Sequence, residues 1–458
     1  MTTVDRAGFQ ASRYLHLLHR HGEAIAFNSH TLAMYELEPV EDGYLRRLAT
    51  GGEVVAPDSV DLTALAGAGL IVRGEEPPLQ AVQRLAEIRQ AARRGRRGHF
   101  GTLRLAVTER CNMACGYCFQ QRLFPDAQPV MSTETLRSTL GWYIEQGRGH
   151  ALTVQYFGGE PMLEWDSIVL GHSIMAEALA DGMITGLRET MTTNGTVLTE
   201  ARASWLVEAG FDLTVSFDGP PEVNDAERRF RGGRGTYEAA ARGLRHWTAA
   251  GGRSSILMTA TTGNVVHLPR FVRWFVEESG LAPKTVGVNS PQPTPSGWET
   301  GGRELADAIW EIWRYCTGRG VRFHGPGTFI PFHLRSLAPQ ADGCVDAADG
   351  EGDPAWPMYV SADGRRSLCL VHHRDHRVEM PADEDPTRFG HAWHTGTDPV
   401  HECDTCIASQ TCGGPCSLER VLWGGRLNED RCGFMRRMTT LVLTASPSTV
   451  DGDLAGRR

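Results

Sequence analysis

Three cysteines on one short stretch, Cys111, Cys115 and Cys118, follow directly after the strand-like apolar run at residues 103–107. Thiolates are soft ligands that suit iron–sulfur clusters, and three of them at C-x3-C-x2-C spacing can converge on one [4Fe–4S] cube. A cube normally takes four protein ligands, so three cysteines leave one iron open to a substrate or cofactor. The alternatives are a zinc site or three buried structural cysteines.

Further polar motifs follow, each near the end of a strand-like run. Glycines at a strand end let the backbone approach closely, and a neighbouring carboxylate can pair with an ammonium group. A hydroxyl and a carboxylate at the carboxyl end of barrel strands suit ribose hydroxyls. Singly each motif is weak, because a lone Gly-Gly-Glu-Pro is more often only a turn. The residues concerned are Gly159, Glu160, Thr193, Asn194, Ser216, Asp218 and Arg228.

The order of these motifs resembles that of the radical S-adenosylmethionine (SAM) enzymes. The resemblance implies that Cys111, Cys115 and Cys118 hold a [4Fe–4S] cluster whose open iron chelates SAM. It implies that Glu160 holds the methionyl amine and that Arg228 meets the SAM carboxylate. The full set of SAM contacts implied is Tyr117, Gly159, Glu160, Thr193, Asn194, Ser216, Asp218 and Arg228.

Most of the other cysteines lie near the C-terminal end, in a pattern that resembles the SPASM domain with its two auxiliary iron–sulfur clusters. The resemblance implies that Cys403, Cys406, Cys412 and Cys432 ligate one auxiliary cluster. It assigns Cys344, Cys369 and Cys416 to the other and leaves Cys316 outside. The chain would then carry three [4Fe–4S] clusters. Structural zinc is the alternative for the C-x2-C pair.

Two departures from the SPASM pattern concern the first auxiliary cluster. No further cysteine stands between Cys344 and Cys369 to supply a fourth ligand. Cys316 could supply it, a carboxylate such as Asp342 or Asp346 could replace it, or an iron could stay open for substrate. Sulfatase-maturating relatives place a catalytic aspartate directly after the counterpart of Cys369, where this chain has Leu370. An apolar side chain cannot accept a proton, which disfavours that activity and leaves the catalytic acid and base unassigned.

Residues 1–80 read as a separate small module. A β-hairpin with its turn at His21-Gly22, two helices near 43–48 and 62–66, and an apolar strand near 69–72 predict a winged-helix-like unit. It resembles the precursor-recognition domain of ribosomal-peptide maturases, which binds a leader peptide as an extra strand. The alternatives are a DNA-binding wing and a purely structural cap.

The rest of the chain predicts an α/β protein. Residues 81–98 form a helical linker, and strand-like runs alternate with helices over 99–310, which predicts a partial (β/α)6 TIM-like barrel. The SPASM domain covers 311–440, and 441–458 form a disordered tail. The net charge of −9 argues against a mainly electrostatic nucleic-acid binder. The absence of a long apolar run predicts a cytoplasmic protein with no membrane span.

These features predict a radical SAM peptide maturase. The expected chemistry begins with one electron from a flavodoxin- or ferredoxin-type donor, which cleaves SAM to a 5′-deoxyadenosyl radical. That radical takes hydrogen from a ribosomally synthesised precursor peptide, and a thioether or carbon–carbon crosslink results. The alternatives are a sulfatase-maturating type of enzyme, an enzyme acting on a small molecule, and a non-enzymatic iron–sulfur redox sensor.

Overall fold

A computed structural model describes residues 6–51, 54–95, 100–126, 128–289, 300–340, 356–371, 373–374, 379–381, 400–416, 419, 424 and 426–445. The chain divides into two compact units. Unit 1 joins Met1–Arg94 with Gly327–Ala348 and Gly396–Arg458, and unit 2 joins Gly95–Pro326 with Asp349–Thr395. The consecutive domain boundaries expected from the sequence stay predictions, because each unit is assembled from segments far apart in the chain.

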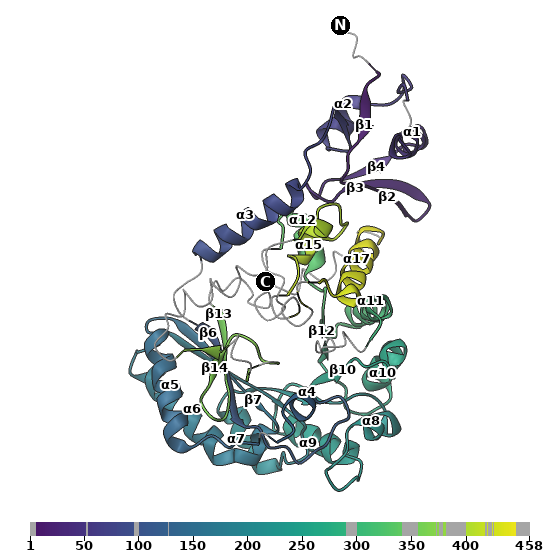
Figure 1. Ribbon diagram of the computed structural model, residues 1–458. Coiled ribbons are helices and arrows are strands. Elements are labelled where there is room, and N and C mark those ends of the chain that lie inside the picture. Colours follow the sequence, from purple (N-terminus) through teal and green to yellow (C-terminus); the bar gives the residue numbers. More distant parts are fainter. Residues whose placement is uncertain are drawn as a thin grey trace. The chain divides into compact units, whose positions relative to one another are not determined.

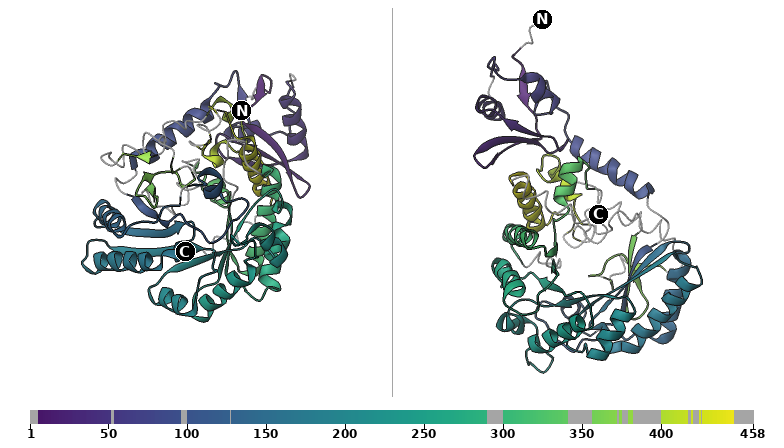
Figure 2. Two further views of the ribbon diagram at one scale, coloured as in Figure 1. Left: turned by 60° about the horizontal axis from the view of Figure 1, so that its bottom comes forward. Right: turned by 180° about the vertical axis from the view of Figure 1, so that it is seen from behind.

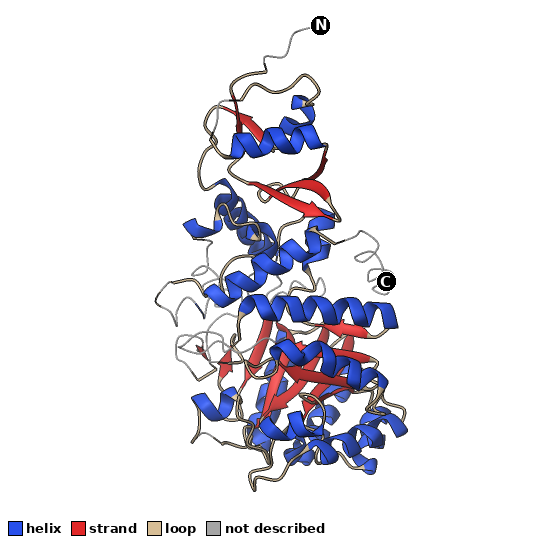
Figure 3. Ribbon diagram, turned by 90° about the vertical axis from the view of Figure 1, so that its right-hand side faces the viewer, coloured by secondary structure: helices blue, strands red, loops and turns tan. Residues whose placement is uncertain are grey.

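Unit 2 is built on one twisted sheet with helices along it (Figures 1 and 3). Strands β6 to β11 lie in chain order and pair in parallel. This arrangement confirms the predicted partial (β/α)6 barrel, and its six strands lie within residues 99–310, where alternating strands and helices were predicted. They are β6 (Phe100–Thr108), β7 (Ala151–Gly158), β8 (Gly186–Thr193), β9 (Asp212–Ser216), β10 (Ser255–Thr259) and β11 (Thr285–Asn289).

Four short strands that were not predicted extend this sheet at its two edges. Strand β12 pairs in parallel with β11, and β13 pairs in parallel with β6. Strands β14 and β15 continue outward from β13 in antiparallel pairs. Because β6 and β13 run in the same direction, their C-terminal ends lie on the same side of the sheet, and the segments that follow them begin there. The bounds are β12 (Arg322–His324), β13 (Trp356–Val360), β14 (Arg366–Ser367) and β15 (Glu379–Met380).

The longer helices of unit 2 cover the outer side of the curved sheet, whereas the short α4 lies on its inner side (Figures 1 and 2). Helix α5 illustrates why they form: the Ser132 hydroxyl caps its first turn, and Leu136, Leu140 and Ile144 place one buried stripe along it. The helices are α4 (Phe119–Leu123), α5 (Thr133–Gln146), α6 (Trp165–Ala180), α7 (Glu200–Glu208), α8 (Pro221–Glu227), α9 (Tyr237–Ala249), α10 (Leu268–Glu277) and α11 (Gly302–Arg319). Short 3-10 turns are η1 (Pro161–Glu164) and η2 (Val265–His267).

Unit 1 contains the predicted N-terminal hairpin, with both turn residues at positive φ, 52° at His21 and 90° at Gly22. That geometry suits a two-residue hairpin turn. Three antiparallel strands form one sheet in the order β2-β3-β4, and β1 pairs with β5. The strands are β1 (Phe9–Ala11), β2 (Leu15–Arg20), β3 (Glu23–Asn28), β4 (Met34–Leu37) and β5 (Ile71–Arg73).

Helices from both ends of the chain complete unit 1. Apolar residues of α1 and α2 pack with β3 and β5 in one core, while Phe27 and Leu32 pack against Leu443 near the C-terminus. The N-terminal module therefore shares a core with the C-terminal helix. The helices are α1 (Pro39–Ala49), α2 (Leu62–Gly67), α3 (Gln80–Gly95), α12 (Ile330–Ser336), α15 (Ser409–Cys412) and α17 (Glu429–Leu443), with the 3-10 turn η3 (His401–Cys403).

Over the part of the chain that the structure describes, every helix is too short or too polar to cross a membrane.

Candidate functional site

The loop with Cys111, Cys115 and Cys118 leaves β6 and is held by backbone contacts. The Ala114 N–H donates to the carbonyl of Arg229 at 2.8 Å, and the Arg231 side chain donates to the carbonyl of Cys111 at 2.7 Å. All three thiols are free and half-buried. Burial, together with the nearby charges of Glu160, Cys115 and Cys118, raises the pKa of Cys111 to about 12. Thiolates are the donors that cluster iron requires, although no group of three or more His, Cys, Asp or Glu side chains among the described residues is close enough to hold a single metal ion.

Two glycines let the end of β7 approach this loop. A Cβ on Gly158, whose φ is 127°, would lie 2.0 Å from the carbonyl oxygen of Thr108. A Cβ on Gly159 would lie 2.2 Å from the carbonyl oxygen of Arg110. The N–H groups of Gly159 and Glu160 donate to those same two carbonyls. The glycines were expected to let backbone approach a ligand, and in the structure they let it approach the cysteine loop.

Glu160 is fully buried beside this loop. Its Oε1 accepts hydrogen bonds from the Thr193 hydroxyl at 2.7 Å and from the Met162 N–H at 3.1 Å. Its Oε2 accepts one from the Asn194 N–H at 2.7 Å. Burial raises the pKa of Glu160, while these hydrogen bonds oppose the rise. Because Glu160 also raises the pKa of Cys111, the predicted Glu160, Thr193 and Asn194 gather on that side of the loop.

Tyr117, Asp218 and Arg228 gather on the Cys115 side. The Tyr117 hydroxyl donates to Asp218 Oδ2 at 2.5 Å, and an Arg228 nitrogen lies 3.8 Å from the same oxygen. Burial raises the pKa of Asp218, while the Arg228 guanidinium opposes the rise. Arg228 also lowers the pKa of Cys115, which burial holds at about 11. Ser216 ends β9, two residues before Asp218.

Four other cysteines line a single pocket in unit 1. Cys412 raises the pKa of each of the other three, so the four thiols lie near one another. Arg436 hydrogen-bonds Cys406, and Arg431 pairs with Glu419 at 3.3 Å on the pocket wall. Four thiolates with two arginines beside them suit a cluster that carries net negative charge. The four are Cys403, Cys406, Cys412 and Cys432, the set implied for one auxiliary cluster.

The set implied for the other auxiliary cluster stays a prediction. Cys344 lies outside the described residues, as do the alternative ligands Asp342 and Asp346. Cys369 belongs to unit 2 and Cys416 to unit 1. Cys316 is fully buried in α11.

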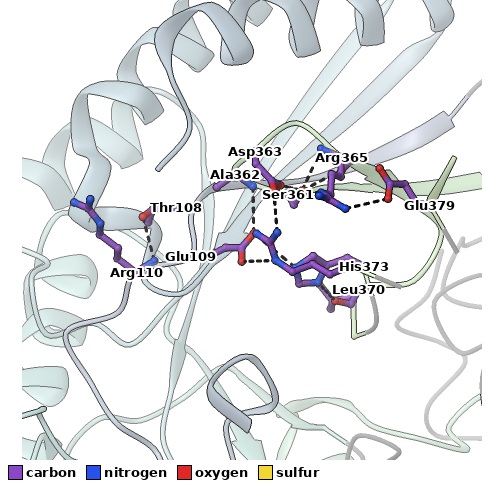
Figure 4. A network of polar contacts seen from close by, with 11 residues as sticks. Thr108, Glu109, Arg110, Ser361, Ala362, Asp363, Arg365, Leu370, His373 and Glu379 are labelled. Carbon is purple, nitrogen blue, oxygen red and sulfur yellow. Dashed lines mark hydrogen bonds and ion pairs between the residues drawn. The ribbon is translucent and has the colours of Figure 1, made fainter. Parts of the chain in front are cut away.

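Sequence reasoning missed two buried carboxylates beside the cysteine motifs. Glu109, two residues before Cys111, pairs with Arg374, and Figure 4 shows Glu109 near Ala362 and His373. Asp404, directly after Cys403, accepts hydrogen bonds from the Tyr14 hydroxyl and from the Leu79 and Ala81 N–H groups. The only signal was an acidic residue next to a cysteine, and an acidic residue is usually exposed to solvent.

Comparison with known proteins finds one family match and several relatives. Residues 105–274 match the radical SAM superfamily. The Fe-coproporphyrin III synthase of Methanosarcina barkeri is 30% identical over 38% of this chain, and the match spans only 40% of that protein. The AdoMet-dependent heme synthase of Oleidesulfovibrio alaskensis is 26% identical over 71% of this chain and 84% of that protein.

Two solved structures share the fold. Native anSMEcpe with bound AdoMet superimposes with a TM-score of 0.62 at 17% identity, over 76% of this chain and 98% of its own. Streptococcus suis SuiB bound to the precursor peptide SuiA has a TM-score of 0.55 at 14% identity, over 93% of this chain and 99% of its own. Together with the cysteine loop and the parallel sheet, these matches show that residues 105–274 form a radical SAM domain of an enzyme, and that the chain shares the fold of anSMEcpe and SuiB.

Proposed function

We propose that this enzyme is a peptide maturase that removes hydrogen from a precursor peptide and installs a thioether or carbon–carbon crosslink. The observation that carries the proposal is the composition of unit 1. It combines a small N-terminal β-sheet, which we interpret as a peptide-recognition module, with a pocket lined by four cysteines. The fold likeness to SuiB, which was solved with a precursor peptide, supports the same conclusion.

The residues around the first cysteine loop fit a cluster and SAM. Cys111, Cys115 and Cys118 would hold the cluster, and together with SAM it would supply a carbon-centred radical. Glu160 would hold the methionyl amine: a carboxylate has about four acceptor sites, and three are used by the hydrogen bonds above. The remaining site is on Oε2. Arg228, paired with Tyr117 and Asp218, would meet the SAM carboxylate.

The N-terminal sheet offers an edge to a peptide. In the described part of the chain, β2 and β4 each pair on one side only, with β3. An extended leader peptide adds to such an edge through main-chain hydrogen bonds. Anchoring the leader raises the effective concentration of the reacting segment without altering the radical chemistry.

The remaining parts of the proposal concern the auxiliary clusters and the electron source. We assign one auxiliary [4Fe–4S] cluster to the four-cysteine pocket and a second to Cys344, Cys369 and Cys416. An acidic one-electron carrier of the flavodoxin or ferredoxin type would reduce the enzyme. Leu370 disfavours the sulfatase-maturating reaction, because an apolar side chain cannot take a proton.

The test is anaerobic incubation with SAM, dithionite and the peptide encoded by any short reading frame found beside the gene. The expected product has lost two hydrogen atoms per crosslink, as read by mass spectrometry. A peptide that stays unmodified while 5′-deoxyadenosine accumulates would reject this peptide as the substrate. Peptides from other neighbouring reading frames would then be assayed in the same way.

A second candidate is chemistry on a tetrapyrrole. The relative named as a heme synthase aligns with 71% of this chain, far beyond the radical SAM domain. Incubation with Fe-coproporphyrin III under the same conditions separates the two candidates. SAM-dependent consumption of the porphyrin, with no change in any peptide, would favour this alternative.

A further inference from the structure

A buried carboxylate connects the first cysteine loop to the segment that carries Cys369. Glu109 stands two residues before Cys111, and only 2% of its side chain is exposed. Its Oε1 accepts a hydrogen bond from Arg374 at 2.8 Å, and its Oε2 accepts another from the same guanidinium at 3.3 Å. The Ala362 N–H lies 3.4 Å from Oε1. Glu109 thus contacts the chain on both sides of Cys369.

The sheet explains why these segments meet. Strand β13 lies beside β6, with Val360 opposite Leu105, and the two strands are parallel. The C-terminal ends of both strands therefore lie on the same side of the sheet. Glu109 follows β6 and Ala362 follows β13, so their contact results from the register of the two strands (Figure 4).

The guanidinium of Arg374 extends the network outward. It donates to Asp363 Oδ2 at 2.8 Å, and Asp363 also accepts from Arg365 at 3.3 Å. Arg365 in turn pairs with Glu379 on β15 at 3.2 Å. Charges of alternating sign therefore run from β6 to the outermost strand of the sheet. Glu109 and Arg374 form the most buried ion pair of this network. Their two hydrogen bonds are bidentate and charge-assisted, which makes this pair stronger than the more exposed contacts of Arg365.

Cys369 lies within the part of the chain that this network encloses. Its N–H donates to the Ser367 hydroxyl at 3.0 Å, and the carbonyl of the next residue, Leu370, lies 3.0 Å from His373 Nδ1. The ring of His373 is fully buried, 4.9 Å from that of Phe124, which follows α4 and the cysteine loop. His373 Nε2 is also 3.6 Å from Glu109 Oε1. Two independent contacts therefore join the Cys369 segment to the loop of Cys111.

We propose that Glu109 is a positioning residue that fixes the Cys369 segment against the Cys111–Cys118 loop. It thereby sets the spacing between the site of SAM cleavage and one ligand of the first auxiliary cluster. The inference rests on the proposed function only where it treats Cys369 as a cluster ligand. The ordering of residues 361–374 by Glu109 is a separate claim that can be measured without any substrate.

The first measurement is hydrogen–deuterium exchange of the anaerobically reconstituted full chain. Glu109→Gln removes the charge that holds Arg374, so residues 361–374 should exchange at least about tenfold faster. Glu189→Gln is the matched control, because Glu189 is another buried carboxylate of unit 2, paired with His172 and Tyr156. It should leave exchange of residues 361–374 unchanged. Unchanged exchange in Glu109→Gln, or equal acceleration in Glu189→Gln, would overturn the positioning role.

A second variant covers the case in which Glu109→Gln does not fold. Asp363 is about one-third exposed, so Asp363→Asn should be tolerated. It breaks the outer contact of Arg374 and should speed exchange in the same segment by about threefold. If residues 361–374 exchange at the wild-type rate in this variant, the ion-pair network does not order that segment.

The spacing claim has its own readout. In the dithionite-reduced enzyme, the magnetic interaction between the SAM-binding cluster and the first auxiliary cluster can be measured by electron paramagnetic resonance. It should change in Glu109→Gln and stay as in the wild type in Glu189→Gln. Iron content of Cys369→Ala tests the proposed function separately. If that variant keeps all of its iron, Cys369 is no ligand and the cluster assignment fails, while the exchange result still decides the role of Glu109.

Discussion

The two cysteine sites of this enzyme differ in the number of thiols and in the charges beside them. The loop of unit 2 brings three thiols next to two buried carboxylates, Glu160 and Asp218. The pocket of unit 1 brings four thiols next to two arginines, Arg431 and Arg436. Three thiols leave an iron open, and polar groups beside it can hold a ligand. Four thiols complete the coordination, and arginines stabilise the negative charge. The first arrangement suits chemistry and the second suits holding or passing an electron.

Loss of the three-thiol loop should have the largest effect. The triple variant Cys111→Ala, Cys115→Ala, Cys118→Ala removes every protein ligand of that cluster, so SAM cleavage under dithionite should disappear. Formation of 5′-deoxyadenosine by liquid chromatography is the measurement. Wild-type levels of product in this variant would overturn the assignment of chemistry to unit 2.

Glu160→Gln tests whether the carboxylates beside that loop hold the ligand. The amide keeps the size of the side chain but offers one oxygen to three hydrogen-bond donors, and it cannot attract an ammonium group. We expect kcat/KM for SAM cleavage to fall about 100-fold, which corresponds to about 3 kcal/mol. A loss below about threefold would mean that the methionyl amine is held elsewhere.

The four-thiol pocket is tested by its iron content. With three cubes, the reconstituted chain should hold about 12 iron atoms, and Cys412→Ala should lose about four of them. SAM cleavage should survive in that variant, because the loop of unit 2 is intact. Ser409→Ala is the control, since Ser409 lines the same pocket but carries no thiol. Zinc in the pocket, with about four iron atoms per chain, would mean that the four cysteines hold a structural zinc ion and no iron–sulfur cluster.

Local patterns explain which parts of the molecule could be predicted from sequence. The six barrel strands and the hairpin at His21-Gly22 are visible as apolar runs and turn residues. The grouping of Cys403, Cys406, Cys412 and Cys432 could be expected from a family resemblance. Strand β12 has only three residues, too few for a periodic pattern.

The carboxylate contacts could not be predicted, because their partners are distant in the chain. Arg374 lies 265 residues after Glu109, and Asp404 lies 390 residues after Tyr14. Each carboxylate stands within two residues of a cysteine, and nothing local distinguishes it from an exposed one. Long-range strand pairing, here β6 with β13, decides which of them becomes buried.

The smallest effect concerns the buried carboxylate of unit 1, which corresponds to Glu109 of unit 2. Asp404 accepts hydrogen bonds from the Tyr14 hydroxyl at 3.1 Å, from the Leu79 N–H at 2.8 Å and from the Ala81 N–H at 3.2 Å. Two of these donors lie at the start of α3, where a negative charge also meets the positive end of the helix dipole. Asp404 therefore ties the four-cysteine pocket to the N-terminal module.

Asp404→Asn should lower the free energy of unfolding of unit 1 by about 2–4 kcal/mol, because an amide accepts fewer hydrogen bonds and carries no charge. The control is Asp58→Asn, in which an exposed carboxylate of the same unit loses its pair with Arg6 and the cost should stay below about 0.5 kcal/mol. Urea titration of the reconstituted enzyme, followed by exchange of residues 9–73, gives both values. If Asp404→Asn costs no more than Asp58→Asn, the N-terminal module is held by its other contacts with the C-terminal segment, such as the packing of Phe27 and Leu32 against Leu443. Loss of the pocket cluster would then leave peptide anchoring unaffected, and the two functions of unit 1 would be independent.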